Sequence, residues 1–231
     1  MEALRPRAHL LAAAALAVLW AGLPRGGACQ VAGSRKAAVE VTLVAEPRPA
    51  RRAAWADALP PVEISSAMSG ASCPLRLYGV GGELDAAARA RFELIVGGDG
   101  APHELSPRLE QLVFKAAYHF GGARVLIVSG YRQHAGRHTA GEALDFKLSG
   151  VQAAQLAAWL RGLPRVGVGI YTHPRTQYVH LDVRDTSYHW LDASPPGITW
   201  KERPLPDPGQ ARRDAAWTPQ ADLPSSLEAP R

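Results

Sequence analysis

The chain has 231 residues and a hydrophobic content of 47%, which is enough for one ordinary folded domain with flanking segments. Its formal net charge is +5, but residues 1–28 alone hold a net +2, which leaves +3 dispersed over the rest of the chain. This weak basic excess gives no case for a nucleic-acid-binding protein. At most, it fits contact with an anionic wall polymer or membrane surface.

Residues 1–28 have the order of residue types that is typical of an export signal. Arg5 and Arg7 precede the apolar run of residues 10–20, and small residues follow up to Ala28. The apolar run is too short to cross a bilayer, which takes about 20 apolar residues. We therefore predict a signal peptide that is removed after Ala28 and directs the protein to the periplasm or cell envelope.

Two alternatives follow for Cys29, which would be the first residue of the exported chain. Bacterial lipoproteins carry their lipid anchor on a cysteine at this point, although Gly26 here replaces the leucine that usually stands three residues earlier. Without a lipid, Cys29 can instead form a disulfide with Cys73, because exported proteins meet oxidising conditions.

The two segments that flank the central part of the chain lack the periodicity of helices and strands. Residues 29–73 are rich in Ala, Arg and Pro, so we expect a flexible tether. Residues 193–231 are rich in proline, charged and small residues, which predicts a disordered tail. The folded domain is then expected over residues 74–192.

Within this domain, helix and strand signals follow one another at short spacing. Ser106 and Pro107 are typical of an N-cap and a first helical position, and Gly121 ends the helix they begin. A second helix is predicted at residues 151–160. We predict further strands at residues 75–79, 124–129, 166–171 and 178–183. This mixture indicates an α+β domain with a small, mostly antiparallel sheet flanked by helices.

Polar residues gather on one face of two strands. The strand that contains Asp145 alternates with apolar residues, so Asp145 faces away from the core. The same alternation puts His180 and Asp182 together on the polar face of a later strand. His138 lies seven residues before Asp145, in a glycine-containing segment that can bend back toward it. The sequence thus brings histidine and carboxylate side chains onto neighbouring polar faces.

Imidazole nitrogen and carboxylate oxygen bind zinc at about 2.0–2.2 Å, and three protein ligands with one open position are typical of a catalytic site. A single histidine or aspartate on a strand is more often structural, so these residues alone leave both interpretations open. No Gly-x-Ser-x-Gly turn surrounds Ser129, which excludes a serine hydrolase of that type.

The motif His138-x-x-Gly141-x-Ala143-x-Asp145, followed by His180 on a strand, resembles the zinc peptidases of the M15 family. These include D-Ala-D-Ala carboxypeptidases and murein endopeptidases, and they share a hedgehog-like fold. The resemblance extends over residues 74–192 and is closer to the YcbK-like branch. It implies that His138, Asp145 and His180 bind Zn²⁺ and that the substrates are peptidoglycan peptides.

The sequence departs from the family pattern at the position of the general base. Carboxypeptidases of the family have a glutamate three residues before the last zinc-binding histidine, and Gln177 stands there in this chain. Glutamine cannot take a proton from water. Asp182, two residues after His180, is the predicted substitute, or it orients His180 instead. Glu142 is a weaker candidate for the base.

Arg132 follows the turn after the strand at residues 124–129. In the resembling enzymes an arginine here holds the substrate or the charge that develops in the transition state, a task that suits its planar group of five donors. We therefore predict Arg132 as a catalytic residue, with a surface arginine in a turn as the alternative.

The predicted function is that of an exported zinc metallopeptidase that hydrolyses peptidoglycan stem peptides or their cross-links, as an endopeptidase or a carboxypeptidase. Gln177 favours an alternative, a catalytically weak or inactive peptidoglycan-binding module of the same fold. A third interpretation is attachment to an anionic surface through the arginines, which predicts binding that is lost steeply with salt.

Overall fold

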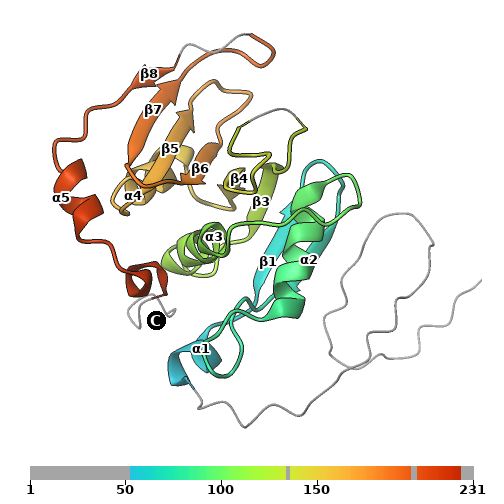
Figure 1. Cartoon of the computed structure of the whole chain (residues 1–231). Coiled ribbons are helices and arrows are strands. Elements are labelled where there is room, and N and C mark those ends of the chain that lie inside the picture. Colours follow the sequence, from blue (N-terminus) through green and yellow to red (C-terminus); the bar gives the residue numbers. More distant parts are fainter. Residues whose placement is uncertain (1–52, 134–135, 199–201, 225–231) are drawn as a thin grey trace, which may run out of the picture.

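A computed structural model describes residues 53–133, 136–198 and 202–224. One mixed sheet of eight strands lies at its centre, in the order β2-β1-β3-β4-β6-β5-β7-β8 (Figure 1). Neighbouring strands are antiparallel except β1 with β3 and β5 with β7. The strands are β1 (Val62–Ser66), β2 (Ser72–Leu75), β3 (Val125–Ser129), β4 (Ala143–Leu148), β5 (Val166–Tyr171), β6 (Val179–Val183), β7 (Tyr188–Asp192) and β8 (Arg203–Pro204). The helices are α1 (Ala54–Ala58), α2 (Ala86–Gly97), α3 (Pro107–His119), α4 (Ala153–Leu160), α5 (Gln210–Ala215) and the 3₁₀ helix η1 (Pro219–Asp222). The predicted α+β class is confirmed.

The two faces of the sheet differ in character where β4 and β6 lie side by side. Leu144 and Phe146 of β4, with Val179 and Leu181 of β6, are fully buried in one hydrophobic core. Helix α4 packs against β4, β5 and β6, and α3 packs against β6 and β1. Because side chains alternate along a strand, the residues between these apolar positions point to the opposite face. That face carries the polar residues that the sequence singled out.

Most elements predicted for the central part of the chain are present. Helix α3 begins at Pro107 with Ser106 as its N-cap, and α4, β3, β5 and β6 lie within two residues of their predicted bounds. The strand predicted at residues 75–79 is displaced, because β2 ends at Leu75 and only Tyr78 forms an isolated bridge, to Leu84.

Helix α2 was missed by the sequence analysis, although its ends carry ordinary signals. The Asp85 side chain accepts a hydrogen bond from the backbone N–H of Ala88 at 2.7 Å and caps the helix. Gly98 ends it in the left-handed conformation with φ of +72°. Its mixed sequence of alanine, arginine and apolar residues hides the buried side that contains Phe92 and Val96.

The prediction of a flexible tether over residues 29–73 is wrong for residues 53–73. This segment forms α1, β1 and β2, and β1 is an inner strand of the sheet. Val62 and Ile64 are fully buried, and Ile64 pairs with Val125 of β3 in a parallel register. A five-residue strand offers little local periodicity, and its partner β3 lies 61 residues farther along the chain, so local composition did not reveal it.

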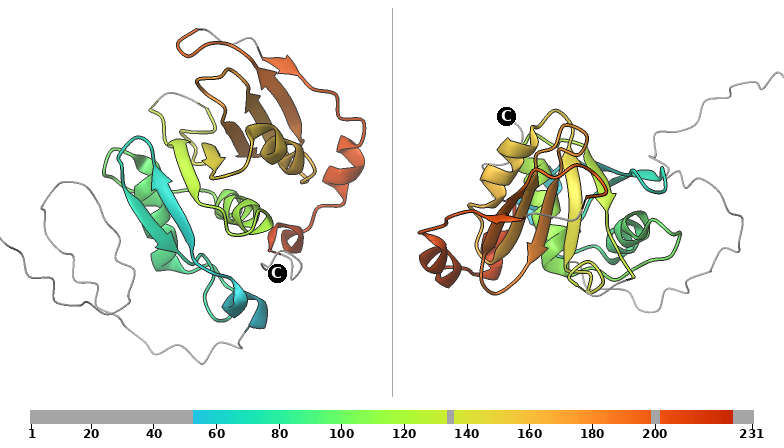
Figure 2. Two further views of the ribbon diagram at one scale, coloured as in Figure 1. Left: turned by 180° about the vertical axis from the view of Figure 1, so that it is seen from behind. Right: turned by 90° about the horizontal axis from the view of Figure 1, so that it is seen from above.

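The prediction of a disordered tail over residues 193–231 is wrong for residues 203–222. This part of the chain forms β8, α5 and η1 and runs back along the edge of the domain (Figures 1 and 2). Arg108 Nε donates to Asp222 at 2.8 Å, and Lys115 Nζ donates to the Ala221 carbonyl at 2.7 Å. The segment is held to the domain by polar contacts of this kind and not mainly by apolar packing. Its proline-rich and weakly apolar composition therefore did not indicate that it is ordered.

Several predictions fall on parts of the chain that the structure does not describe. The signal peptide at residues 1–28, most of the predicted tether and residues 225–231 lie outside the described ranges. Cys73 is buried in β2, but Cys29 lies outside these ranges, so lipidation and disulfide pairing of Cys29 both stay predictions. Among the described helices, none is long and apolar enough to cross a membrane.

Asp214 should be a main anchor of the C-terminal segment. It is 6% exposed, and its carboxylate accepts hydrogen bonds from Arg165 N at 2.6 Å, Ser187 N at 2.8 Å, Ser187 Oγ at 2.6 Å and Gln210 Nε2 at 2.7 Å. Asp214→Ala leaves several of these donors unpaired, so we expect the free energy of unfolding to fall by about 2–4 kcal/mol in a denaturant titration. Asp185→Ala, at an exposed position, is the matched control and should change it little.

The same carboxylate predicts a pH dependence. Burial alone would raise the pKa of Asp214, but the hydrogen bonds from Ser187 and Arg165 outweigh it and lower the pKa to about 2. Because the folded pKa lies below the unfolded value, the stabilisation is present above about pH 4 and is lost as the pH falls toward 2. The stability difference between wild type and Asp214→Ala should shrink over that range, and a constant difference would contradict this account.

Candidate metal centre

The register of β4 against β6 places two of the predicted metal ligands opposite each other. Asp145 pairs with His180 across the antiparallel ladder, so both side chains point to the same face of the sheet. His180 Nδ1 lies 2.8 Å from Asp145 Oδ1. Both residues are buried, with exposed fractions of 2% for Asp145 and 8% for His180.

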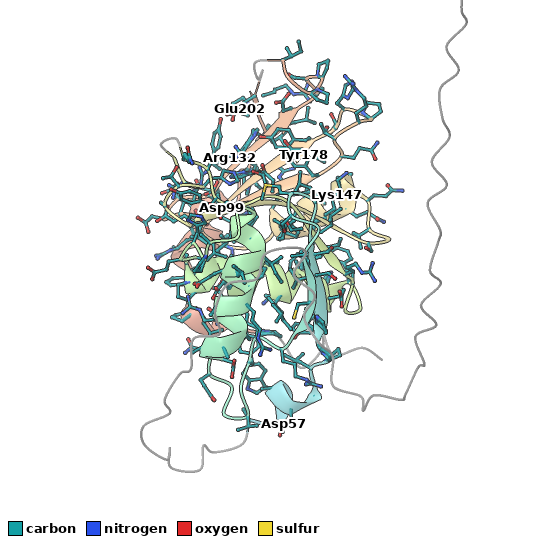
Figure 3. The ribbon with its side chains drawn as sticks, turned by 90° about the vertical axis from the view of Figure 1, so that its right-hand side faces the viewer. Asp57, Asp99, Arg132, Lys147, Tyr178 and Glu202 are labelled. Carbon is teal, nitrogen blue, oxygen red and sulfur yellow. The ribbon has the colours of Figure 1, made fainter. Side chains whose placement is uncertain are left out.

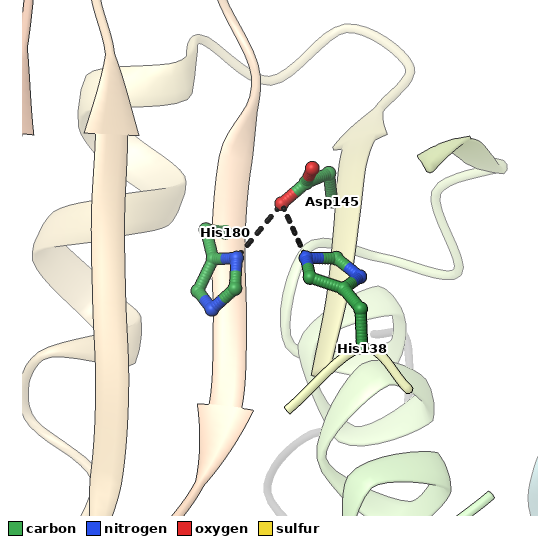
Figure 4. Close-up of side chains that lie close together, drawn as sticks. All are labelled: His138, Asp145 and His180. Carbon is green, nitrogen blue, oxygen red and sulfur yellow. Dashed lines mark hydrogen bonds and ion pairs between the residues drawn. The ribbon is translucent and has the colours of Figure 1, made fainter. Parts of the chain in front are cut away.

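His138 reaches the same point from the segment that precedes β4. Gly141 turns this segment with φ of +68°, and a Cβ added there would lie 2.0 Å from the Glu104 carbonyl oxygen, so only glycine fits. His138 Nε2 lies 3.6 Å from Asp145 Oδ1 (Figure 4). The structure thus brings together His138, Asp145 and His180, whose ligand atoms all lie within 4.8 Å of one another.

The hydrogen bonds of His138 show whether one of its ring nitrogens is available to bind a metal ion. His138 Nδ1 lies 2.7 Å from the carbonyl oxygen of Gly130, which can only accept, so the ring proton is on Nδ1. Nε2 is buried and has no hydrogen-bond partner among the described residues. An unpaired buried nitrogen aimed at a carboxylate oxygen and a second imidazole is the arrangement that a zinc ion would complete. The spacing also fits, because tetrahedral ligands at the usual bond lengths are about 3.4 Å apart.

Asp182 lies on the far side of the His180 ring from Asp145. Its Oδ2 is 3.1 Å from His180 Nε2, while Arg184 Nε donates to its Oδ1 at 2.6 Å. The Asp182 side chain is fully buried. A proton on His180 Nε2 that is donated to Asp182 leaves the Nδ1 lone pair directed at the Asp145 side, as a metal ligand requires. Of the two roles predicted for Asp182, this geometry favours orienting His180.

Arg132 lies beside the cluster, as its predicted role requires. Its Nη2 donates to Asp145 Oδ2, and its Nε donates to Ser129 Oγ at 3.0 Å. The second oxygen of Asp145 is therefore held by a cation while the first faces the two histidines. The Arg132 side chain is 40% exposed, so part of the guanidinium still faces solvent.

Burial and hydrogen bonding act in opposite directions on the charges of the cluster. Burial alone would raise the pKa of Asp145, but the neighbouring imidazoles of His138 and His180 outweigh it and hold the pKa below its usual range. In the same way, His180 and Arg184 lower the pKa of Asp182 to about 2 despite its burial. For His180, burial is outweighed by Asp145 and Asp182, which raise its pKa. Both carboxylates are therefore ionised at neutral pH and able to act as ligand or acceptor.

Other residues considered for catalysis lie elsewhere. Gln177 is exposed, has φ of +45° in the turn between β5 and β6, and lines a hollow against α4. Glu142 precedes β4 and pairs with Arg137 at 2.7 Å. His189 is buried and lies 3.0 Å from Asp207 of the C-terminal segment. None of the three belongs to the metal cluster.

Three aromatic residues beside the cluster were not predicted from the sequence. Trp190 of β7 lies close to His180, with ring centroids 5.1 Å apart. Tyr171 and Tyr178 stack on each other at 4.3 Å. Tyr178 precedes His180 by two residues, so the period of two that located Asp182 also places it on this face. Trp190 is placed there by strand pairing, because His180 lies opposite Gly169 and Gly169 lies opposite Trp190.

A family model described as Peptidase M15 matches residues 92–182. The match includes all three residues of the cluster and supports the M15 peptidase family, whose members are zinc-dependent. Neither the curated proteins nor the solved structures contain a match to this chain. The finer assignment to the YcbK-like branch stays a prediction.

Replacement of any cluster residue should abolish tight metal binding. His138→Ala, Asp145→Ala and His180→Ala each remove one of three protein ligands, so we expect less than about 0.1 zinc per chain after dialysis, against about one for wild type. Elemental analysis of the purified full-length chain measures this. His173→Ala is the matched control, because His173 lies outside the cluster and should leave the zinc content unchanged. Equal zinc in all four variants would exclude this site.

Asp182→Asn separates the two roles proposed for Asp182. If Asp182 orients His180, the amide weakens the support of the ring, and zinc affinity should fall by about 10- to 100-fold. If Asp182 is instead the general base, zinc affinity should be unchanged while kcat falls by about 10²- to 10⁴-fold. Competition with a zinc-sensitive dye measures the first effect, with the exposed Asp185→Asn as control. We expect the first outcome.

Proposed function

We propose that the chain is an exported zinc metallopeptidase that hydrolyses peptide bonds in peptidoglycan stem peptides or their cross-links. The observation that carries the proposal is the convergence of His138 Nε2, Asp145 Oδ1 and His180 Nδ1 in a segment that matches Peptidase M15. The signal-like order of residues 1–28 supports export, since peptidoglycan lies outside the cytoplasmic membrane.

The residues of the chain would divide the chemical work among them. His138, Asp145 and His180 would hold zinc, which would supply Lewis-acid polarisation of the scissile carbonyl and activation of water. Arg132 holds the outer oxygen of Asp145 and presents its exposed edge to a substrate carboxylate or a developing oxyanion. Burial and the charge of Asp145 raise the pKa of Tyr178 to about 12, so its hydroxyl stays protonated and can donate a hydrogen bond.

A digest of purified muropeptides tests the proposal. Zinc-loaded wild-type protein should release new peptide fragments that mass spectrometry detects, and a chelator should stop the release because the ligand set would then hold no metal. His180→Ala should be inactive, and His173→Ala should retain activity. Intact muropeptides after incubation with protein that holds stoichiometric zinc would contradict the proposal. The fragment masses would also distinguish an endopeptidase from a carboxypeptidase.

A second function is favoured by the absence of an acidic residue at position 177 and by the engagement of Asp182 with Arg184 and His180. The chain would then be a catalytically weak or inactive module that binds wall peptide. This alternative predicts that the protein sediments with purified wall material without releasing muropeptides. Attachment through arginine charge alone would instead be lost between low and high salt.

A further inference from the structure

A hollow of about 260 Å³ lies next to the metal cluster and is not needed to hold the metal. We call it the Asp192 pocket; it is lined by Arg132, Tyr171, Thr176, Tyr178, Asp192 and residues 194–198. Arg132 and Tyr178, which are labelled in Figure 3, form its side toward the cluster. Its other side is formed by the end of β7 and the chain that follows it.

The sheet register fixes the position of the pocket relative to the metal ligands. His180 of β6 lies opposite Gly169 of β5, which in turn lies opposite Trp190 of β7. Two residues farther along β5 and β7, Tyr171 lies opposite Asp192. Side chains two residues apart on a strand share a face and are about 6.6–6.8 Å apart. Asp192 therefore belongs to the side-chain row next to the row of the metal cluster, on the same face.

Asp192 is 4% exposed, and its carboxylate forms no ion pair with a cation among the residues that the structure describes. Its Oδ1 accepts a hydrogen bond from the Ser194 backbone N–H at 2.7 Å. Its Oδ2 has no hydrogen bond or ion pair with any described residue, and Arg132, the cation of the lining, is engaged with Asp145 and Ser129. Among the described residues nothing occupies Oδ2, so this oxygen can accept from a donor that enters the pocket, and its charge favours a cationic donor.

The aromatic wall of the pocket suits a cation. Tyr171 and Tyr178 stack at 4.3 Å and both line the pocket beside Asp192, so their aromatic rings border the space that a cation would occupy. A carboxylate beside two tyrosines is a recognition set for a primary ammonium group, which donates three hydrogen bonds.

We propose that the Asp192 pocket binds a primary ammonium group of the peptide substrate, with Asp192 Oδ2 as its acceptor. This inference rests on the proposed peptidase function and narrows the substrate class. The ammonium belongs to a peptide with a diamino-acid side chain or a free N-terminus within one or two residues of the scissile bond. Asp192 is thereby a specificity-determining residue and not a metal ligand.

Calorimetric binding of matched tripeptides to the zinc-loaded full-length chain tests the inference. The probes are lysyl-D-alanyl-D-alanine acetylated on Nα only, on Nε only and on both nitrogens. Wild type should bind at least one mono-acetylated probe about tenfold or more tightly than the doubly acetylated one, since a charged hydrogen bond is gained. The preferred mono-acetylated probe shows whether the side chain or the N-terminus supplies the ammonium.

Asp192→Asn should remove the preference and leave affinity for the doubly acetylated probe unchanged. Asparagine keeps an oxygen that can accept from the Ser194 N–H, so the fold and zinc content should be retained, and both are measured. Asp185→Asn, at an exposed position outside the pocket, should keep the wild-type preference. Equal affinity of wild type for all three probes, no binding of any probe at millimolar concentration, or a preference that survives in Asp192→Asn would each overturn the inference.

The two proposals fail in different ways. A preference for the ammonium probe that depends on Asp192, without cleavage of any probe or muropeptide, supports the pocket and contradicts the peptidase. If all probes are cleaved with the same KM, and this KM is unchanged in Asp192→Asn, the result supports the peptidase function and overturns ammonium binding in the Asp192 pocket.

Discussion

The pairing of Asp145 with His180 across β4 and β6 is the constraint on which the site depends. A shift of one residue in this register would turn His180 into the core and bring Leu181 or Val179 to the metal face. The buried apolar residues of both strands oppose such a shift, because each would lose its place under α3 and α4. The core that stabilises the sheet therefore also fixes the distance between the two ligands.

Charges of alternating sign continue from this pair in both directions. Arg132 contacts Asp145, Asp145 contacts His180, His180 contacts Asp182, and Asp182 contacts Arg184. Each buried carboxylate thus has a guanidinium on its outer side and shares His180 on its inner side, so neither charge is left uncompensated. The arrangement also settles the orientation of the His180 ring, since one nitrogen faces each carboxylate. A metal ion bound to Asp145 could therefore also bind His180 Nδ1 without a rotation of the His180 ring.

The sequence was sufficient for the local part of the site and insufficient for the part that depends on distant pairing. Alternation along single strands placed Asp145, His180 and Asp182 on polar faces, and this needs no knowledge of neighbouring strands. The position of Asp192 beside the cluster depends on which strands are adjacent, which local periodicity does not contain. The same limit explains β1 and the C-terminal segment: β1 is an inner strand because it also pairs with the distant β3, and the segment is held by Arg108 and Lys115 of α3.

The C-terminal segment and the metal face meet at the start of β5. Asp214 accepts from the backbone N–H of Arg165, which directly precedes β5, and from Ser187, which directly precedes β7. Two residues farther along β5, Gly167 lies beneath the Asp182 and Arg184 pair, where a Cβ would come within 2.1 Å of Asp182 Oδ2. The closeness of β5 to this ion pair means that any shift of its first residues changes the space available to Asp182. Because Asp182 in turn faces His180 Nε2, a continuous series of contacts joins Asp214 of the C-terminal segment to a predicted metal ligand.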